Sequence, residues 1–462
     1  MSDSVKKTKA LTSRRQFLQT ASALSVLGGA TPLALNLAGI GAAAAQSAGE
    51  DYRALVCVFL FGGNDQTNTV IPFDPAEFDA YTAARSNIAR SAAELTSLGT
   101  VAAQGGRSFA LPNELAPMAS LYAGGKLAIV GNVGPLIVPT TKAQYQSAAV
   151  PLPSKLFSHN DQQSVWQSSG AEGATSGWGG RIADLIVSGN ANQTFTAISV
   201  TGAAVYLSGR SVLQYQVGAN GSVAVSGLGG TLFGSTTASQ ALRQLITAAR
   251  PGMFENEYNR VTARSIDANA ALASALSAAP AITTPFPTGN PLADQLKMVA
   301  RTISARQTLG VRRQVFFVSL GGFDTHDFQL RDQPGLHTTL AAAVSAFYQS
   351  TVELGVADRV TTFTASDFGR TLTSNGDGSD HGWGSHHFVI GGAVKGGSIY
   401  GSFPTIVLGT SEDVGSGRLL PSTSVDQYAA TLGRWFGVSD TDLATVVPNI
   451  ANFSQRDLGF LA

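Results

Sequence analysis

The sequence has a single cysteine, Cys57, among its 462 residues. One cysteine cannot form a disulfide within the chain, and it excludes zinc and iron–sulfur sites that need several thiolates. Because Cys57 lies within the apolar run Ala54–Phe61, we expect it to be a small buried hydrophobic residue.

Charge is scarce as well, since only 13% of the residues are charged whereas 44% are hydrophobic. This composition excludes a disordered chain and suffices for a large core. Without residues 1–45 the chain has 25 Lys+Arg against 29 Asp+Glu. A mildly acidic surface argues against nucleic acid as a partner, because phosphate binding needs a basic face. Beyond residue 48 no apolar run reaches spanning length, so we expect no stable membrane span in the mature chain.

Residues 1–48 have the pattern of an export signal. Arg14 and Arg15 precede a phenylalanine and the apolar stretch Ala21–Ala45, which ends in small residues suited to cleavage. Paired arginines at this place are typical of twin-arginine signals. We therefore expect the twin-arginine translocase as a partner during export, and a final location in the periplasm or outside the cell. The alternative is an uncleaved anchor, but a proline and an asparagine interrupt the stretch.

Short apolar runs typical of strands buried on both faces of a parallel sheet recur along the chain. They are Ala54–Phe61, Leu127–Gly131, Phe195–Val200, Val315–Leu320, Val360–Ala365 and Phe388–Ile390. Helical patterns cover Asn113–Ala123, Ser176–Val187, Thr237–Ala249, Phe254–Ala278, Pro291–Leu309, Leu336–Leu354 and Ser424–Phe436. This order predicts one α/β domain over residues 49–462, with a mostly parallel central sheet flanked by helices. An insertion is expected at about 202–292, with a β-hairpin over Tyr206–Phe233 followed by helices.

Three of the predicted strands end in an acid, namely Asp65, Asp324 and Asp367. Ligands of open α/β sheets bind beyond the carboxyl ends of the strands. We therefore expect these carboxylates to converge at one edge of the sheet, where a divalent cation would relieve their repulsion.

Four of the six histidines lie in or just after the last two of these segments: His326, His381, His386 and His387. Imidazole with carboxylate suits zinc, manganese or iron, whereas oxygen ligands alone suit magnesium or calcium. Taken one by one, each acid is better explained as a cap and each histidine as a surface residue. The set together predicts a metal site.

Ser158 is a candidate nucleophile. A serine is a weak nucleophile unless a metal or a base lowers the pKa of its hydroxyl. The alternative, an N-cap for a helix that begins near His159, is equally compatible with the sequence.

Several motifs together resemble a family of twin-arginine-exported bacterial proteins. They are Gly-Gly-Asn-Asp65, Phe-Ser158-His159, Gly177-Trp178-Gly179-Gly180-Arg181, Gly-Gly-Phe-Asp324-Thr-His326, Ser-Asp367-Phe-Gly-Arg370 and Asp380-His381-Gly-Trp-Gly. The family is known as a domain of unknown function and is grouped with the alkaline phosphatase and sulfatase superfamily. The resemblance covers essentially the whole mature chain.

The resemblance implies an alkaline phosphatase-like fold with a site for two divalent metal ions (zinc, manganese, magnesium or calcium). The implied metal ligands are Asp65, Asp324, His326, Asp367, Asp380, His381 and His386. Ser158 is the implied nucleophile, and Arg370 or Arg181 would meet an anionic substrate. Departures from the superfamily pattern leave open whether Asp367 or Asp380 is the ligand, and they make Asp327 a further candidate. The nucleophile motif of sulfatases, Cys/Ser-x-Pro-x-Arg, is absent.

These patterns predict a metal-dependent hydrolase of small phosphate or sulfate esters. One alternative is a binding or assembly protein that keeps a metal as a brace, since a fold does not fix a function. Another is a protein that handles extracellular polysaccharides, with Trp166, Trp178 and Trp383 as stacking platforms.

Overall fold

A computed structural model describes residues 51–222 and 224–462, and residues Tyr52–Ala462 form one compact unit. The predicted export signal, residues 1–48, lies outside the described residues. Within the described chain, no helix combines the length and apolar character that crossing a membrane requires.

The centre of the unit is a nine-stranded sheet with the order β13-β5-β12-β9-β1-β8-β6-β7, to which β14 adds beside β5. The strands are β1 (Arg53–Leu60), β5 (Leu127–Gly134), β6 (Ala197–Ser199), β7 (Tyr215–Gln216), β8 (Arg313–Leu320), β9 (Val360–Ser366), β12 (Ser385–Gly391), β13 (Ile399–Tyr400) and β14 (Thr423–Ser424). Strand β12 runs antiparallel to both of its neighbours, and the other pairings are parallel. The predicted α/β class with a mostly parallel sheet is confirmed.

Two smaller sheets consist of β2 (Ile71–Pro72), β3 (Leu95–Val101) and β4 (Arg107–Pro112), and of β10 (Arg370–Ser374) with β11 (Ser379–His381). The α-helices are α3 (Pro75–Arg85), α4 (Ala116–Ala123), α5 (Lys142–Gln146), α6 (His159–Ser168), α7 (Trp178–Ile186), α8 (Thr236–Thr247), α9 (Met253–Ala278), α10 (Pro291–Ser304), α11 (Gln329–Glu353), α12 (Val425–Phe436) and α13 (Leu443–Val446). Helix α11 begins before Pro334 rather than after it, so it is longer than predicted.

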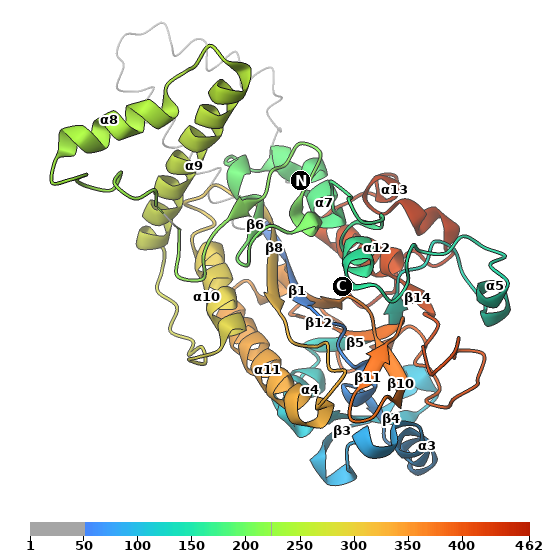
Figure 1. Cartoon of the computed structure of the whole chain (residues 1–462). Helices are drawn as coiled ribbons and strands as arrows, with labels where there is room; N and C mark the ends of the chain where they lie inside the picture. Colours follow the sequence, from blue (N-terminus) through green and yellow to red (C-terminus); the bar gives the residue numbers. More distant parts are fainter. Residues whose placement is uncertain (1–50, 223) are drawn as a thin grey trace, which may run out of the picture. The chain divides into compact units, whose positions relative to one another are not determined.

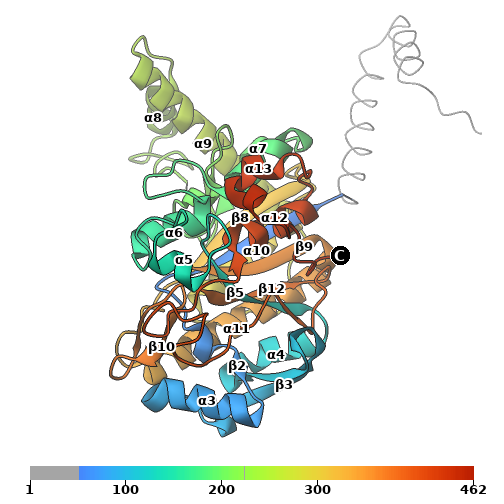
Figure 2. The same ribbon diagram turned by 90° about the vertical axis from the view of Figure 1, so that its right-hand side faces the viewer.

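Helices cover both faces of the sheet because its central strands are apolar on both faces. In β1, Val56 and Val58 join one core with residues of α4, α10 and α11. Cys57 and Phe59 point the opposite way and join a second core with residues of α7, α12 and α13. Figures 1 and 2 show these two groups of helices on opposite sides of the sheet. Cys57 is buried, as its apolar surroundings predicted.

The parallel register aligns the carboxyl ends of the three central strands. Leu60 of β1 pairs with Leu320 of β8 and with Ser366 of β9. The loops that carry the candidate site therefore leave the sheet at one edge. Gly62, with φ of 114°, lies so close to the backbone of Asp324 that a Cβ atom would clash there, so these loops can pack together only with glycine.

The insertion differs from its prediction in one respect. Helices α8 and α9 form as predicted and project from the sheet at the upper left of Figure 1. Among the described residues of the segment 206–233, the strand is the short β7, which pairs in parallel with β6. Ala219 and Asn220 form a tight turn, closed by a bridge between Gly218 and Gly221, and the described residues on either side of it form no two-stranded hairpin.

Candidate metal centre

Three loops and one helix bring imidazole and carboxylate groups together beyond the carboxyl ends of β1, β8 and β9. Asp324 and His326 follow β8, and His381 ends β11. His159 is the first residue of α6, a helix that begins after an unusual backbone stretch in which Phe157 has φ of 74°. We call His159, Asp324, His326 and His381 the histidine cluster.

The Nε2 atoms of all three histidines lie close to the Asp324 carboxylate. The distance to Oδ2 is 3.4 Å from His159, and the distances to Oδ1 are 3.2 Å from His326 and 3.3 Å from His381. Nε2 of His326 and Nε2 of His381 are only 2.9 Å apart. Possible ligand atoms of His159, Asp324 and His381 all lie within 4.8 Å of one another.

The other ring nitrogen of each histidine faces an oxygen that can only accept a hydrogen bond from it. Nδ1 of His159 lies 2.7 Å from Asp367, and Nδ1 of His326 lies 3.2 Å from Asp380. Nδ1 of His381 lies 2.6 Å from the carbonyl of Phe157. These oxygens favour the tautomer with the proton on Nδ1, in which the lone pair of Nε2 is free to bind a metal ion.

In this tautomer the Nε2 lone pairs and the Asp324 carboxylate face one another, an arrangement that a cation between them would stabilise. Nε2 of His159 is buried and has no hydrogen-bond partner in the described part of the chain. With metal–ligand bonds of about 2.0–2.1 Å, two ligands of one tetrahedral zinc lie about 3.3 Å apart, close to the measured distances to Asp324. A carboxylate that orients a metal-binding histidine through its other nitrogen is a common arrangement. His159, Asp324 and His381 thus fit a transition-metal ion, and His326 lies beside them.

Asp367 and Asp380 both contact Nδ1 atoms, so the structure gives them the same role, that of orienting a histidine. Asp367 is fully buried and also accepts hydrogen bonds from the Gly62 N–H at 3.2 Å and from Gln163 at 2.8 Å. Both carboxylates thus lie on the Nδ1 side of the histidines, behind the cluster.

Arg370 compensates the negative charge of Asp324. Its Nη1 donates to Oδ1 of Asp324 at 2.8 Å, and the guanidinium is buried. Partial burial opposes ionisation of Asp324, but the Arg370 contact outweighs it and lowers the pKa of this carboxyl. The hydrogen bond with Asp367 raises the pKa of His159, whereas burial lowers the pKa of His381.

The structure gives Asp65 a role that differs from the predicted metal ligand. Its side chain caps the short 3-10 helix Gln66–Asn68 and forms a buried ion pair with Arg85. Gln329 donates a further hydrogen bond to it. Because these partners occupy both carboxylate oxygens, Asp65 has no free oxygen directed at the histidine cluster.

His386 also lies apart from the cluster. It is buried in β12, accepts a hydrogen bond from the backbone N–H of Asn132 at 3.0 Å and stacks on Phe403. Its neighbour His387 packs against Trp166, and His337 contacts Thr69. Burial lowers the pKa of each of these three histidines to about 3.

These buried histidines predict a loss of stability in acid. In the unfolded chain a histidine takes up a proton near pH 6.5, whereas the folded chain keeps these three neutral down to about pH 3. Their contribution is therefore complete above about pH 6.5 and falls as the pH decreases, by up to about 1.4 kcal/mol per pH unit for each histidine. The free energy of unfolding of the metal-free protein, measured by chemical unfolding at about pH 7 and about pH 5, tests this prediction. The His386→Gln variant should show a smaller difference; equal stability at both pH values contradicts the prediction.

Ser158 occupies the N-cap position of α6, as the alternative to a nucleophile predicted. Its hydroxyl donates to Oδ2 of Asp161 at 2.9 Å and accepts no hydrogen bond from a backbone N–H of the helix. Asp161 is buried, and Lys155 lies 3.6 Å from its other oxygen. A hydroxyl next to a carboxylate is the pairing that a nucleophile with its base requires.

The structure also differs from the predictions for Arg181 and for three tryptophans. Arg181, the other candidate for an anionic substrate, donates to the backbone carbonyls of Ser168, Ser176 and Val446. The tryptophans proposed as stacking platforms are buried in the core: Trp166, Trp178 and Trp383. The alternative of a polysaccharide-handling protein therefore loses the surface on which it depended.

Sequence reasoning missed His159 as a ligand. Its position directly after Ser158 in a recognised motif was the available signal, but its partner Asp367 is 208 residues away. Gln163 was missed as well; it lies one helical turn after His159 and contacts the same carboxylate.

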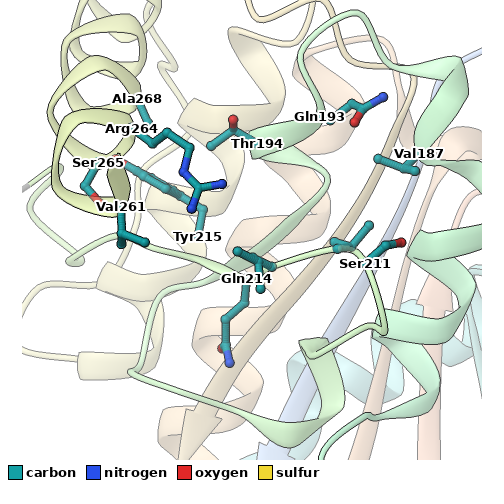
Figure 3. A pocket seen from close by; sticks show the side chains of 12 residues that line it. Val187, Gln193, Thr194, Ser211, Gln214, Tyr215, Val261, Arg264, Ser265 and Ala268 are labelled. Atoms are coloured by element: carbon teal, nitrogen blue, oxygen red, sulfur yellow. The ribbon is translucent and has the colours of Figure 1, made fainter. Parts of the chain in front are cut away.

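A separate pocket lies between α9 and residues 211–215 and has a volume of about 330 Å³ (Figure 3). Its only charged residue is Arg264, which pairs with Glu257 at 3.1 Å. Since neither a carboxylate nor an imidazole lines it, we do not place the chemistry there.

The fold and the site define an α/β protein with a histidine–aspartate cluster at the carboxyl edge of a mostly parallel sheet. The chain belongs to the family described as "Protein of unknown function (DUF1501)", whose model matches residues 52–450. The family predicted from the motifs is thus confirmed.

Several solved structures are similar to this chain. The PsFucS1 sulfatase from Pseudoalteromonas sp. is 9% identical, with a TM-score of 0.36 and coverage of 87% of this chain and 72% of that one. The lipoteichoic acid synthase LtaP from Listeria monocytogenes is 9% identical, with a TM-score of 0.33 and coverage of 87% and 76%. A variant of the alkaline phosphatase PafA is 13% identical, with a TM-score of 0.26 and coverage of 68% and 63%. A search of curated proteins found no match.

Proposed function

We propose that this protein is an exported, metal-dependent hydrolase of phosphate or sulfate monoesters. The observation that carries the proposal is the histidine cluster, in which three anchored imidazoles direct Nε2 at one carboxylate. His159, Asp324 and His381 would hold one divalent ion of the zinc or manganese type, with His326 next to them as a further candidate ligand. The twin-arginine pattern supports export to the periplasm or the exterior.

Ser158 is the proposed nucleophile because it lies next to the cluster in the chain. The carbonyl of Phe157, one residue earlier, accepts from His381, and His159 follows directly. When bound, a metal ion at the cluster would supply Lewis acidity toward the ester oxygens. Arg370 balances the charge of Asp324, so an anionic group can approach the cluster with less repulsion.

The proposed reaction proceeds in two displacements. Asp161 accepts the proton of Ser158 as Oγ bonds to phosphorus or sulfur and the bond to the alcohol oxygen breaks. The proton on Asp161 leaves with the alcohol. Water then bonds to phosphorus or sulfur and gives a proton to Asp161. The bond to Ser158 Oγ breaks, Oγ takes this proton from Asp161, and the free phosphate or sulfate departs.

Metal analysis of the purified mature protein, combined with ester hydrolysis, tests the proposal. We expect about one divalent ion per chain, and hydrolysis of aryl phosphate or aryl sulfate that stops with a chelator and returns with added zinc or manganese. A protein that binds no divalent ion contradicts the proposal. Metal-dependent thermal stability without turnover on either ester would instead favour the metal-braced binding protein.

A further inference from the structure

A second pocket adjoins the histidine cluster along helix α6. It has a volume of about 430 Å³, which lies within the usual range of ligand pockets, about 300–1,000 Å³. Asn160, Gln163 and Gln167 of α6 line one wall, and Phe61 and Phe317 line another. We call it the α6 pocket.

The α6 pocket and the cluster share a wall. Gln163 lines the pocket and donates to Oδ2 of Asp367 at 2.8 Å, the oxygen that also holds Nδ1 of His159 at 2.7 Å. Phe61 precedes Gly62, whose N–H donates to the other oxygen of Asp367. A molecule with its ester group at the cluster would therefore extend its alcohol part along α6.

The lining of the α6 pocket suits a neutral polar group. Glu172 is its only charged residue, and no lysine, arginine or histidine lines it. The pocket therefore disfavours an anionic group. The phosphate or sulfate group of the substrate would lie instead at the cluster, next to Arg370.

Several amide groups in the α6 pocket remain available for a ligand. Gln163 uses only its Nε2 on Asp367, and Gln167 uses only its Oε1, which accepts from the backbone of Tyr206 at 3.1 Å. The exposed amide of Asn160 makes no hydrogen bond within the described chain. Free amide donors and acceptors together match hydroxyl groups, which both donate and accept. Phe61 and Phe317 add apolar surface for the carbon side of such a group.

We infer that the α6 pocket binds the alcohol part of the substrate, and that this part is a sugar or a similar polyol. The inference rests on the proposed function and specifies its substrate class. Asn160 would recognise a hydroxyl group of the substrate and would take no part in the reaction at the ester.

Matched esters test the inference. Wild-type protein is assayed with glucose esterified at its primary hydroxyl and with the n-hexyl ester of the same anion, for phosphate and for sulfate. We expect kcat/KM to be at least about 10-fold higher for the sugar ester, which corresponds to about one or two hydrogen bonds. Asn160→Leu should remove most of this preference by lowering kcat/KM for the sugar ester. Gln240→Leu, an exposed amide on α8, is the control and should change kcat/KM for neither ester.

The possible failures are distinguishable. Equal kcat/KM for sugar and hexyl esters overturns the sugar pocket while the hydrolase stands. Absence of hydrolysis of all esters overturns the proposed function, and ligand-observed NMR with methyl glucoside then tests the pocket by itself. Binding that is lost in Asn160→Leu but kept in Gln240→Leu supports the pocket, and binding that is equal in both variants overturns it.

Discussion

Asp324→Asn should abolish stoichiometric metal binding. Asp324 is the carboxylate that all three Nε2 atoms face, and the neutral amide removes the negative charge that a cation needs there. Loss of a partner behind a ligand already lowers metal affinity by about 10–100-fold, so loss of this central carboxylate should cost at least about 100-fold. Titration calorimetry with zinc on the chelator-treated protein measures it.

Two matched variants make the result specific. Asp380→Asn alters an exposed carboxylate behind His326 and should weaken binding by about 10-fold only. Asp65→Asn should leave metal affinity unchanged. It should instead lower the free energy of unfolding by about 3–5 kcal/mol, because Arg85 would remain buried without its partner. If Asp65→Asn loses the metal and Asp324→Asn keeps it, the histidine cluster is not the metal site.

The contrast between Asp65 and Asp324 shows how far sequence reasoning reaches here. Both acids follow an apolar strand and paired glycines, and the periodicity of parallel strands correctly places both at one edge of the sheet. Which acid faces the cluster depends on Arg85, which ends helix α3 and pairs with Asp65. This non-local partner leaves no trace in the pattern around either aspartate.

The histidines also show that the sequence pattern alone does not determine which side chains face the cluster. His381 and His386 lie five positions apart in one motif-rich segment, yet one faces the cluster and the other is enclosed in strand β12. The apolar run Phe388–Ile390 predicted a strand there, but the true strand begins at Ser385 and includes both His386 and His387. A shift of three residues in a strand boundary therefore decided which histidines are available for a metal.

The cluster groups the ligands of one ion, whereas the resemblance implied two. With Asp65 in an ion pair and His386 in the core, the predicted ligands for a second ion are used elsewhere. Asp367 and Asp380, also predicted as ligands, hold the histidines by their Nδ1 atoms. In the proposed reaction with a single ion, stabilisation of the leaving oxygen would fall to neighbouring groups rather than to a second metal.

Ser158→Ala should eliminate turnover without loss of the metal. If the hydroxyl is the nucleophile, its removal should lower kcat by at least about 1,000-fold, as for serine nucleophiles in general. The helix itself should suffer little, because the Ser158 side chain makes no hydrogen bond to the backbone of α6. Asp161→Asn should lower kcat by about 100- to 10,000-fold, the usual contribution of a general base.

Both variants are compared with wild type at equal, measured metal content. A further readout is the covalent intermediate: brief incubation with substrate and acid quenching should leave phosphate or sulfate on Ser158, detectable by mass spectrometry. Unchanged kcat in Ser158→Ala would mean that water attacks the ester directly. The hydroxyl would then be only the N-cap partner of Asp161, and the histidine cluster alone would carry the chemistry.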